Sequence, residues 1–352
     1  MFKKEKMYEI TSKKLVLKTF LGKPNRIPLY YWLANPELEA KIGDVVGARC
    51  WFDTFEIFLR EGGPFKRAEE GYHSWSERLD PESYSWPDPE NLSEEIERKI
   101  EKTIMVNNDK SFQAEIIGPT EYSEYSCAPG QTHAAKRLDQ VFHRFDFAAL
   151  TQLNFDKAVK IHKIFFDFIL EGAKKAAEHK AIDSVRLADD FCHYGGSTYN
   201  PRFTEIILER QAKIAAEIKR KGKYAVLHSD GNIAPYLDFL GKHFDGLHPL
   251  DVCQKSTVGA ALAWSLKLGE IRKSLPETVF FTGIPIDLLC NKQISAEDLV
   301  KVVKSVISRT GTERLVLTTT HRPYPSWTYD DFADKVQAIN KFIKSISIES
   351  SF

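Results

Sequence analysis

The sequence is poor in cysteine and has none in close pairs. Its five cysteines are odd in number, widely spaced and without a CxxC motif, at positions 50, 127, 192, 253 and 290. This argues against a disulfide framework and against a structural zinc knuckle. No apolar run approaches the length of a membrane span. The first fourteen residues are rich in charge and lack the apolar run of a signal peptide. We therefore expect a cytoplasmic protein with reduced cysteines.

An excess of either charge is also missing. Lys plus Arg and Asp plus Glu both number 49, so no global field would concentrate the chain on nucleic acid or on anionic lipid. We expect neither as a partner, and an anionic substrate would have to be held locally. Motifs of the types GxSxG, GxxxxGK[ST] and HExxH are absent, which removes the common hydrolase, nucleotide-triphosphatase and zincin patterns.

Apolar segments of strand length recur through the 352 residues and alternate with helical patterns. Eight strands alternating with helices predict an α/β fold, a single-domain (β/α)8 TIM barrel over residues 1–352. An open doubly wound sheet is the alternative, but no GxGxxG follows an early strand. The eight candidate strands are residues 27–33, 50–58, 112–117, 184–188, 224–227, 246–250, 278–283 and 315–319.

Two longer segments interrupt the alternation, at about 64–91 and 122–146. Both follow the carboxyl ends of early strands, the side on which barrel enzymes bind ligands, and both carry aromatic residues. We predict that they are insertions over the barrel mouth that wall the pocket. Plain surface elaboration is the alternative.

The stretch from Lys223 to Asp251 is the most informative part of the chain. An apolar strand at 224–227 is followed by His228 and Asp230, and residues two apart on a strand share a face. A histidine and a carboxylate therefore leave the carboxyl end of one strand together, where barrel enzymes keep their active sites.

Seven segments, in order along nearly the whole chain, resemble those of the uroporphyrinogen decarboxylase superfamily, which includes corrinoid-linked methyltransferases. LHSDGNI is the most similar. The others are GKPNRIPLYYW, WFDTFEIF, IIGPTEY, RLADDF, GIPIDLLCNKQISAEDLVKVV and TTTHRPYPSWTYDDFADKV. The resemblance implies a barrel enzyme.

The methyltransferase side of the superfamily implies a zinc site. Its members hold zinc with His-x-Cys at the fifth strand and Cys near the eighth, and the matching residues here are His228, Asp230 and His321. A zinc ion held by three protein ligands keeps a fourth position open for a substrate atom and acts as a Lewis acid. The expected reaction exchanges a methyl group between a small molecule and a corrinoid on a partner protein. The alternative is that both histidines are hydrogen-bonded rim residues without metal.

The decarboxylase side implies a different reaction, in which uroporphyrinogen loses carboxyl groups without a cofactor. In this family a central Asp stabilises the pyrrole nitrogens, and the matching residues are Asp53 and His321. The arginine pair that grips the substrate's acid groups is missing from YYWLANPELEAK, so we rank this function second. A non-catalytic ligand-binding protein is a third reading.

Further candidates follow other strand ends. Neighbouring residues on a strand face opposite ways, so only one of Asp189 and Asp190 can point into the mouth, and we favour Asp190 as catalytic. Cys253 and His248 are interpreted as buried packing residues. The candidate substrate-binding residues are Trp32, Glu121, Tyr122 and Tyr125, for which packing is the alternative.

Overall fold

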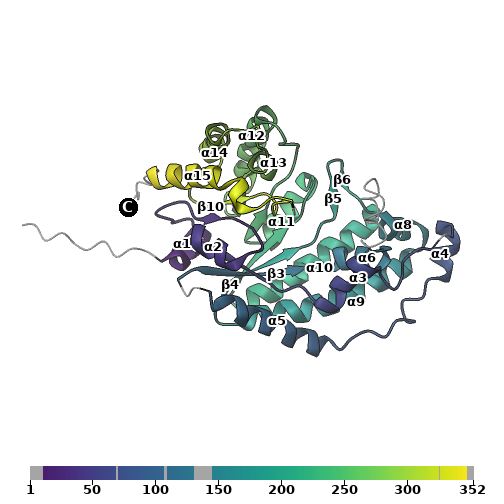
Figure 1. Cartoon of the computed structure of the whole chain (residues 1–352). Helices are drawn as coiled ribbons and strands as arrows, with labels where there is room; N and C mark the ends of the chain where they lie inside the picture. The colour runs from purple at the N-terminus through teal and green to yellow at the C-terminus, as the bar shows by residue number, and fades with distance from the viewer. Residues whose placement is uncertain (1–10, 69, 107–108, 131–144, 325, 347–352) are drawn as a thin grey trace, which may run out of the picture.

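The computed structural model describes residues 11–68, 70–106, 109–130, 145–324 and 326–346. Eight parallel strands form one sheet in the order β1-β10-β9-β8-β7-β4-β3-β2, which confirms the single-domain (β/α)8 barrel (Figure 1). The strands are β1 Leu29–Tyr30, β2 Val45–Arg49, β3 Ser111–Ile117, β4 Ile182–Ala188, β7 Tyr224–His228, β8 Gly246–His248, β9 Val279–Ile284 and β10 Leu315–Thr319.

Helices surround the strands, and the sequence marks their ends. Helix α10, for example, begins where the Asn200 side chain accepts the Arg202 N–H and Pro201 occupies the first turn. Among the described residues, no helix is both long and apolar enough to cross a bilayer. The helices and minor elements are α1 Ser12–Phe20, α2 Pro36–Ile42, α3 Asp53–Glu61, α4 Tyr72–Arg78, α5 Pro89–Ile104, α6 Pro119–Cys127, α8 Phe145–Leu153, α9 Phe155–Glu178, α10 Pro201–Arg220, η1 Ala234–Tyr236, α11 Leu237–His243, α12 Val258–Ser274, α13 Ile286–Leu289, α14 Ala296–Thr310, η2 Tyr329–Asp331, α15 Ala333–Ser345 and the hairpin β5 Cys192–His193 with β6 Gly196–Ser197.

The predicted second strand at 50–58 is wrong. Strand β2 ends at Arg49, and residues 53–61 form helix α3. Phe55 and Phe58, three residues apart, are buried on one face of this helix, while Asp53 supplies negative charge to its first turn. The aromatic residues are therefore spaced for a helix.

Carboxylates close the barrel between β1 and β2. The Asp44 N–H donates to the Leu29 carbonyl at 2.6 Å, and the Asp44 side chain accepts the Leu29 N–H at 2.9 Å. Further along, the buried Glu39 carboxyl accepts the N–H groups of Leu33 and Gly47, both at 2.8 Å. Two acidic side chains thus satisfy backbone donors that a strand pair would otherwise satisfy.

A polar layer crosses the barrel interior beside this closure. Buried Glu115 on β3 forms an ion pair of 2.5 Å with buried Arg186 on β4. The same carboxylate accepts hydrogen bonds from the Tyr30 hydroxyl and, at 3.0 Å, from the Trp32 indole N–H. A Cβ on Gly47 would lie 2.3 Å from a Glu115 oxygen, so only glycine fits there.

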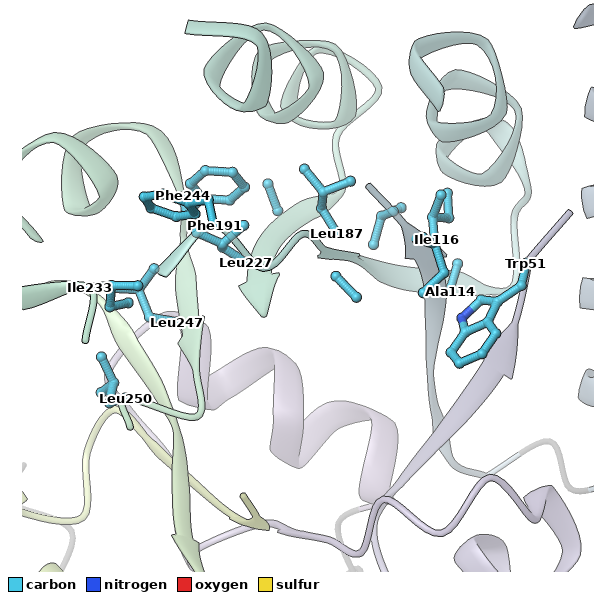
Figure 2. Packing of buried hydrophobic residues seen from close by; sticks show 14 of the residues in the cluster. Trp51, Ala114, Ile116, Leu187, Phe191, Leu227, Ile233, Phe244, Leu247 and Leu250 are labelled. Carbon is cyan, nitrogen blue, oxygen red and sulfur yellow. The ribbon is translucent and has the colours of Figure 1, made fainter. Parts of the chain in front are cut away.

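The main hydrophobic core lies between the strands and the surrounding helices. Figure 2 shows Leu187, Leu227 and Leu247 among its buried side chains, from three adjacent strands. Because side chains alternate along a strand, the next residues, His228 and His248, point into the barrel. The apolar alternation thereby fixes which polar residues face the interior.

The segment at 64–91 packs its aromatic residues against the helices. Trp75 is 1% exposed and its indole N–H donates to the Phe65 carbonyl at 2.9 Å. The Trp86 ring lies 5.2 Å from that of Phe165 on α9, in an edge contact. These two side chains pack in the interior, and the prediction that the segment walls the pocket stays a prediction. In the second segment, residues 131–144 lie outside the described residues, and the prediction that it covers the mouth stays a prediction.

Candidate metal centre

Three side chains converge where strands β4 and β7 end. His228 Nε2 lies 4.0 Å from Asp190 Oδ1 and 3.9 Å from Asp230 Oδ1. One donor atom from each of the three residues lies within 4.8 Å of the others. An imidazole nitrogen and two carboxylate oxygens thus face a common point at the carboxyl end of the barrel.

The backbone after each strand positions the two carboxylates. Asp190 Oδ1 accepts the Asp230 N–H at 2.7 Å, which ties the two strand ends together. The neighbouring Asp189 points the other way and accepts the Thr120 N–H at 2.7 Å and its hydroxyl at 2.9 Å. Burial raises the pKa of Asp189 to about 7. The two neighbours thus face opposite ways, and Asp190 is the one that lies near His228 and Asp230.

A second histidine fixes the tautomer of His228. Its Nδ1 lies 2.6 Å from His248 Nδ1, and His248 Nε2 lies 3.0 Å from the Thr319 carbonyl oxygen. A carbonyl can only accept, so His248 Nε2 carries a hydrogen. Burial, followed by the charge of His228, lowers the pKa of His248 well below its usual value, so this ring is neutral and its Nδ1 accepts.

It follows that His228 donates its Nδ1–H to His248. In neutral His228 the hydrogen is then on Nδ1, and the Nε2 lone pair points toward Asp190 and Asp230. An imidazole whose second nitrogen is held by a hydrogen bond is the usual form of a metal-ligating histidine. The sequence interpretation of His248 as a packing residue missed this contact.

His321 lies at the rim of the group. Its Nδ1 donates to the Arg322 carbonyl at 2.9 Å, and its Nε2 is 4.0 Å from Asp230 Oδ2. The side chain is 39% exposed and is not part of the three-residue group. The predicted set was His228, Asp230 and His321; the structure brings Asp190 to the first two and leaves His321 beside them.

Trp32, predicted to bind substrate, lies among the histidines. Its ring centroid is 5.0 Å from that of His228, 5.6 Å from that of His248 and 5.5 Å from that of His321, each in an edge contact. The side chain is 3% exposed. These contacts restrict the orientation of all three imidazoles.

The other predicted residues lie in different surroundings. Tyr122 is fully buried in the core, and its hydroxyl accepts the Phe52 N–H at 2.9 Å. Tyr125 donates to Glu121 at 2.7 Å. Cys253 is partly buried and outside the three-residue group.

Asp53 lies on the surface at the first turn of α3. Its side chain is 71% exposed and forms an ion pair with Lys99 at 2.9 Å. The hydrogen bond from Lys99 lowers the pKa of this carboxyl. The segment predicted as the second strand is helix α3, and the described hydrogen bonds of Asp53 are with Glu95 and Lys99 on helix α5.

The donor set suits a divalent metal such as zinc. Neutral imidazole and carboxylate are zinc ligands, and ligands about 2.1 Å from a tetrahedral ion lie roughly 3.4 Å apart. The separations from His228 Nε2, 3.9 and 4.0 Å, are slightly wider, and all three donor atoms lie within 4.8 Å of one another. Small side-chain rotations would bring the three atoms to that spacing.

No protein-family model and no curated protein matches the sequence. Among solved structures, the fold is similar to that of a methyltransferase from Methanosarcina mazei, with a TM-score of 0.64 and 15% identity over 95% of this chain and 99% of that one. A B12-independent methionine synthase from Shewanella sp. W3-18-1 is less similar, with a TM-score of 0.39 and 11% identity over 74% of this chain and 67% of that one. At these identities the first similarity shows a shared fold.

Proposed function

We propose that this protein is a metal-assisted methyltransferase of the uroporphyrinogen decarboxylase superfamily, exchanging a methyl group between a small molecule and a corrinoid on a partner protein. The observation that carries the proposal is His228, whose hydrogen bond to His248 directs its second nitrogen toward Asp190 and Asp230. The shared fold with the Methanosarcina mazei methyltransferase and the family resemblance of LHSDGNI support it.

Asp190, His228 and Asp230 are the residues that would hold the metal. Bound zinc would act as a Lewis acid on a thiol or hydroxyl of the small molecule. His321 lies beside this point with Nδ1 committed to a carbonyl, so its Nε2 can take the proton that the thiol or hydroxyl releases when it gains a methyl group. Trp32 excludes water from the inner side of the three imidazoles.

Metal analysis of protein purified without chelators tests the proposal. We expect about one zinc ion per chain in the wild type and loss of zinc in His228→Ala and Asp190→Asn. His243→Ala, which removes a histidine from the end of α11, is the matched control and should keep its zinc. Circular dichroism verifies that each variant is folded. A zinc-free wild type that still methylates a thiol from methylcobalamin would contradict the metal-assisted reaction.

Cofactor-free decarboxylation of uroporphyrinogen remains the second candidate. It requires Asp53 at the barrel centre, whereas this carboxylate is exposed and paired with Lys99. Incubation with uroporphyrinogen, followed by chromatography for coproporphyrinogen, tests it directly, and formation of that product would reverse our ranking.

A further inference from the structure

Arg322 follows His321 after strand β10 and lies between two indole rings. Its guanidinium carbon is 5.4 Å from the Trp32 ring centroid and 4.7 Å from that of Trp51. Within the described part of the chain, the Arg322 side chain forms no hydrogen-bonded ion pair with a carboxylate, and Glu115 and Glu121 act on its charge only at longer range. Guanidinium carries five N–H donors, which ring faces do not satisfy.

Three other basic residues near the barrel mouth or interior have acidic partners. Arg49, on Trp51 with its guanidinium carbon 3.9 Å from the ring centroid, forms an ion pair with Glu56. The ion pair of Arg186 is with Glu115, and Lys255 after β8 forms one of 2.6 Å with Asp251. Arg322 differs from these three residues because its close contacts are with aromatic rings and it forms no direct ion pair.

The two rings hold the guanidinium in a fixed place. Contact with ring faces restrains a planar cation and leaves its N–H edges available for an acceptor, and this preorganisation lowers the entropy cost of binding. Trp32 also contacts the rings of His228 and His321. Arg322 and the candidate metal centre are therefore neighbours around one indole, within the span of a single small molecule.

We propose that Arg322 binds a carboxylate of the substrate while the heteroatom that exchanges the methyl group lies at the metal centre. This inference rests on the proposed function for the heteroatom, and it adds the substrate class: a small acid that carries a thiol or hydroxyl. A planar carboxylate matches the guanidinium fork in a bidentate pair, which a neutral group cannot do.

Binding of two matched thiols to the zinc-loaded protein tests the inference. Isothermal titration calorimetry would compare para-mercaptobenzoate, whose acid group is too distant from its thiol to chelate one ion, with thiophenol. Arg322→Gln should weaken para-mercaptobenzoate binding about tenfold to hundredfold, as expected for charge-assisted hydrogen bonds. It should leave thiophenol binding within about twofold. Arg322→Lys should give an intermediate loss, since it keeps the charge and not the fork.

Arg220→Gln is the control, because it removes the same charge from an exposed position at the end of α10, paired with Glu217. It should bind both thiols as the wild type does. Equal loss of both thiols in Arg322→Gln, or unchanged binding of para-mercaptobenzoate, would overturn the inference while zinc content still supports the proposed function.

A zinc-free wild type would instead contradict the proposed function, and Arg322 is then tested alone. Tryptophan fluorescence would follow titration with benzoate and with benzamide. Benzoate binding that is lost in Arg322→Gln supports the carboxylate site without any metal. The inference is overturned if the wild type does not bind benzoate, or if Arg322→Gln binds it as well as the wild type does.

Discussion

Two clusters of polar side chains occupy the same barrel and differ in how their atoms meet. In the seam cluster, which we define as Glu39, Asp44, Glu115 and Arg186, acceptors face donors: Glu39 accepts two backbone N–H groups and Glu115 meets Arg186. In the mouth cluster, defined as Asp190, His228, Asp230 and His321, acceptor atoms face one another at 3.9 to 4.0 Å.

Burial of polar groups is therefore a poor guide to function. Whether an acceptor atom faces a donor or another acceptor is a better guide. A cluster in which donors meet acceptors contributes to the fold. Converging acceptors favour a cation, and they lie at the end of the barrel where ligands bind. The predictions below test whether the seam cluster affects only stability and the mouth cluster mainly metal binding.

The largest effect is expected for Arg186→Met, which leaves the Glu115 carboxylate buried without its ion pair. We expect a loss of about 3–5 kcal/mol in the free energy of unfolding, measured by urea denaturation in the presence of a chelator. The double variant Arg186→Met/Glu115→Gln should recover part of this loss, since no charge is then buried. A loss below about 1 kcal/mol in the single variant would show that the pair is dispensable to the fold.

A pH-dependent effect follows from Glu39. Burial, followed by the charge of Glu115, raises the pKa of Glu39 from 4.5 to about 8. The resulting stability is fully present below pH 4.5 and is lost as the pH rises toward 8, because the unfolded chain releases the proton first. The slope is at most about 1.4 kcal/mol per pH unit, the value for one proton.

Glu39→Gln removes this titration. The amide NH2 of the glutamine is a donor, so it would face one of the two backbone N–H donors without accepting from it. Urea denaturation of both proteins at several pH values in this window should show the wild type losing its advantage over the variant as the pH rises. A difference in unfolding free energy that stays constant with pH would mean that Glu39 keeps an ordinary pKa.

His248→Phe should weaken zinc binding without removing a ligand. The variant takes away the acceptor of the His228 Nδ1–H, and loss of such a partner typically lowers metal affinity about tenfold to hundredfold. Competition with a chelating dye measures the affinity, and His243→Phe on α11 is the control. Unchanged affinity in His248→Phe would show that the tautomer of His228 is set in another way.

The sequence predicted the barrel because most of its strands are apolar runs between helical patterns. It misplaced the second strand for a physical reason. Strand β2 is short and contains Gly47, which must be small because Glu115 approaches it closely, so its apolar signal is weak. The aromatic residues just after it, Phe55 and Phe58, gave a stronger signal that belongs to a helix.

The site could be predicted only where its residues are close in sequence. His228 and Asp230 share a strand end, and alternation indicated that only one of Asp189 and Asp190 could join them. The contact of His228 with His248 joins two strands, and that of Arg322 with Trp32 and Trp51 joins three segments. Such contacts depend on the closed barrel, so no local spacing indicates them.

The smallest effect is expected for Asp53→Asn, which tests the family-based role of this residue. Its ion pair with Lys99 is mostly exposed, so solvent screens it, and we expect a change of about 0.5 kcal/mol or less in stability. Zinc content and methyl transfer should match those of the wild type, since its described contacts are with Lys99 and Glu95 and not with the mouth cluster. Lys99→Gln, which removes the partner, is the paired control. If methyl transfer falls tenfold or more in Asp53→Asn with stability unchanged, α3 must move this carboxylate toward substrate, and the mouth cluster would be larger than we have defined it.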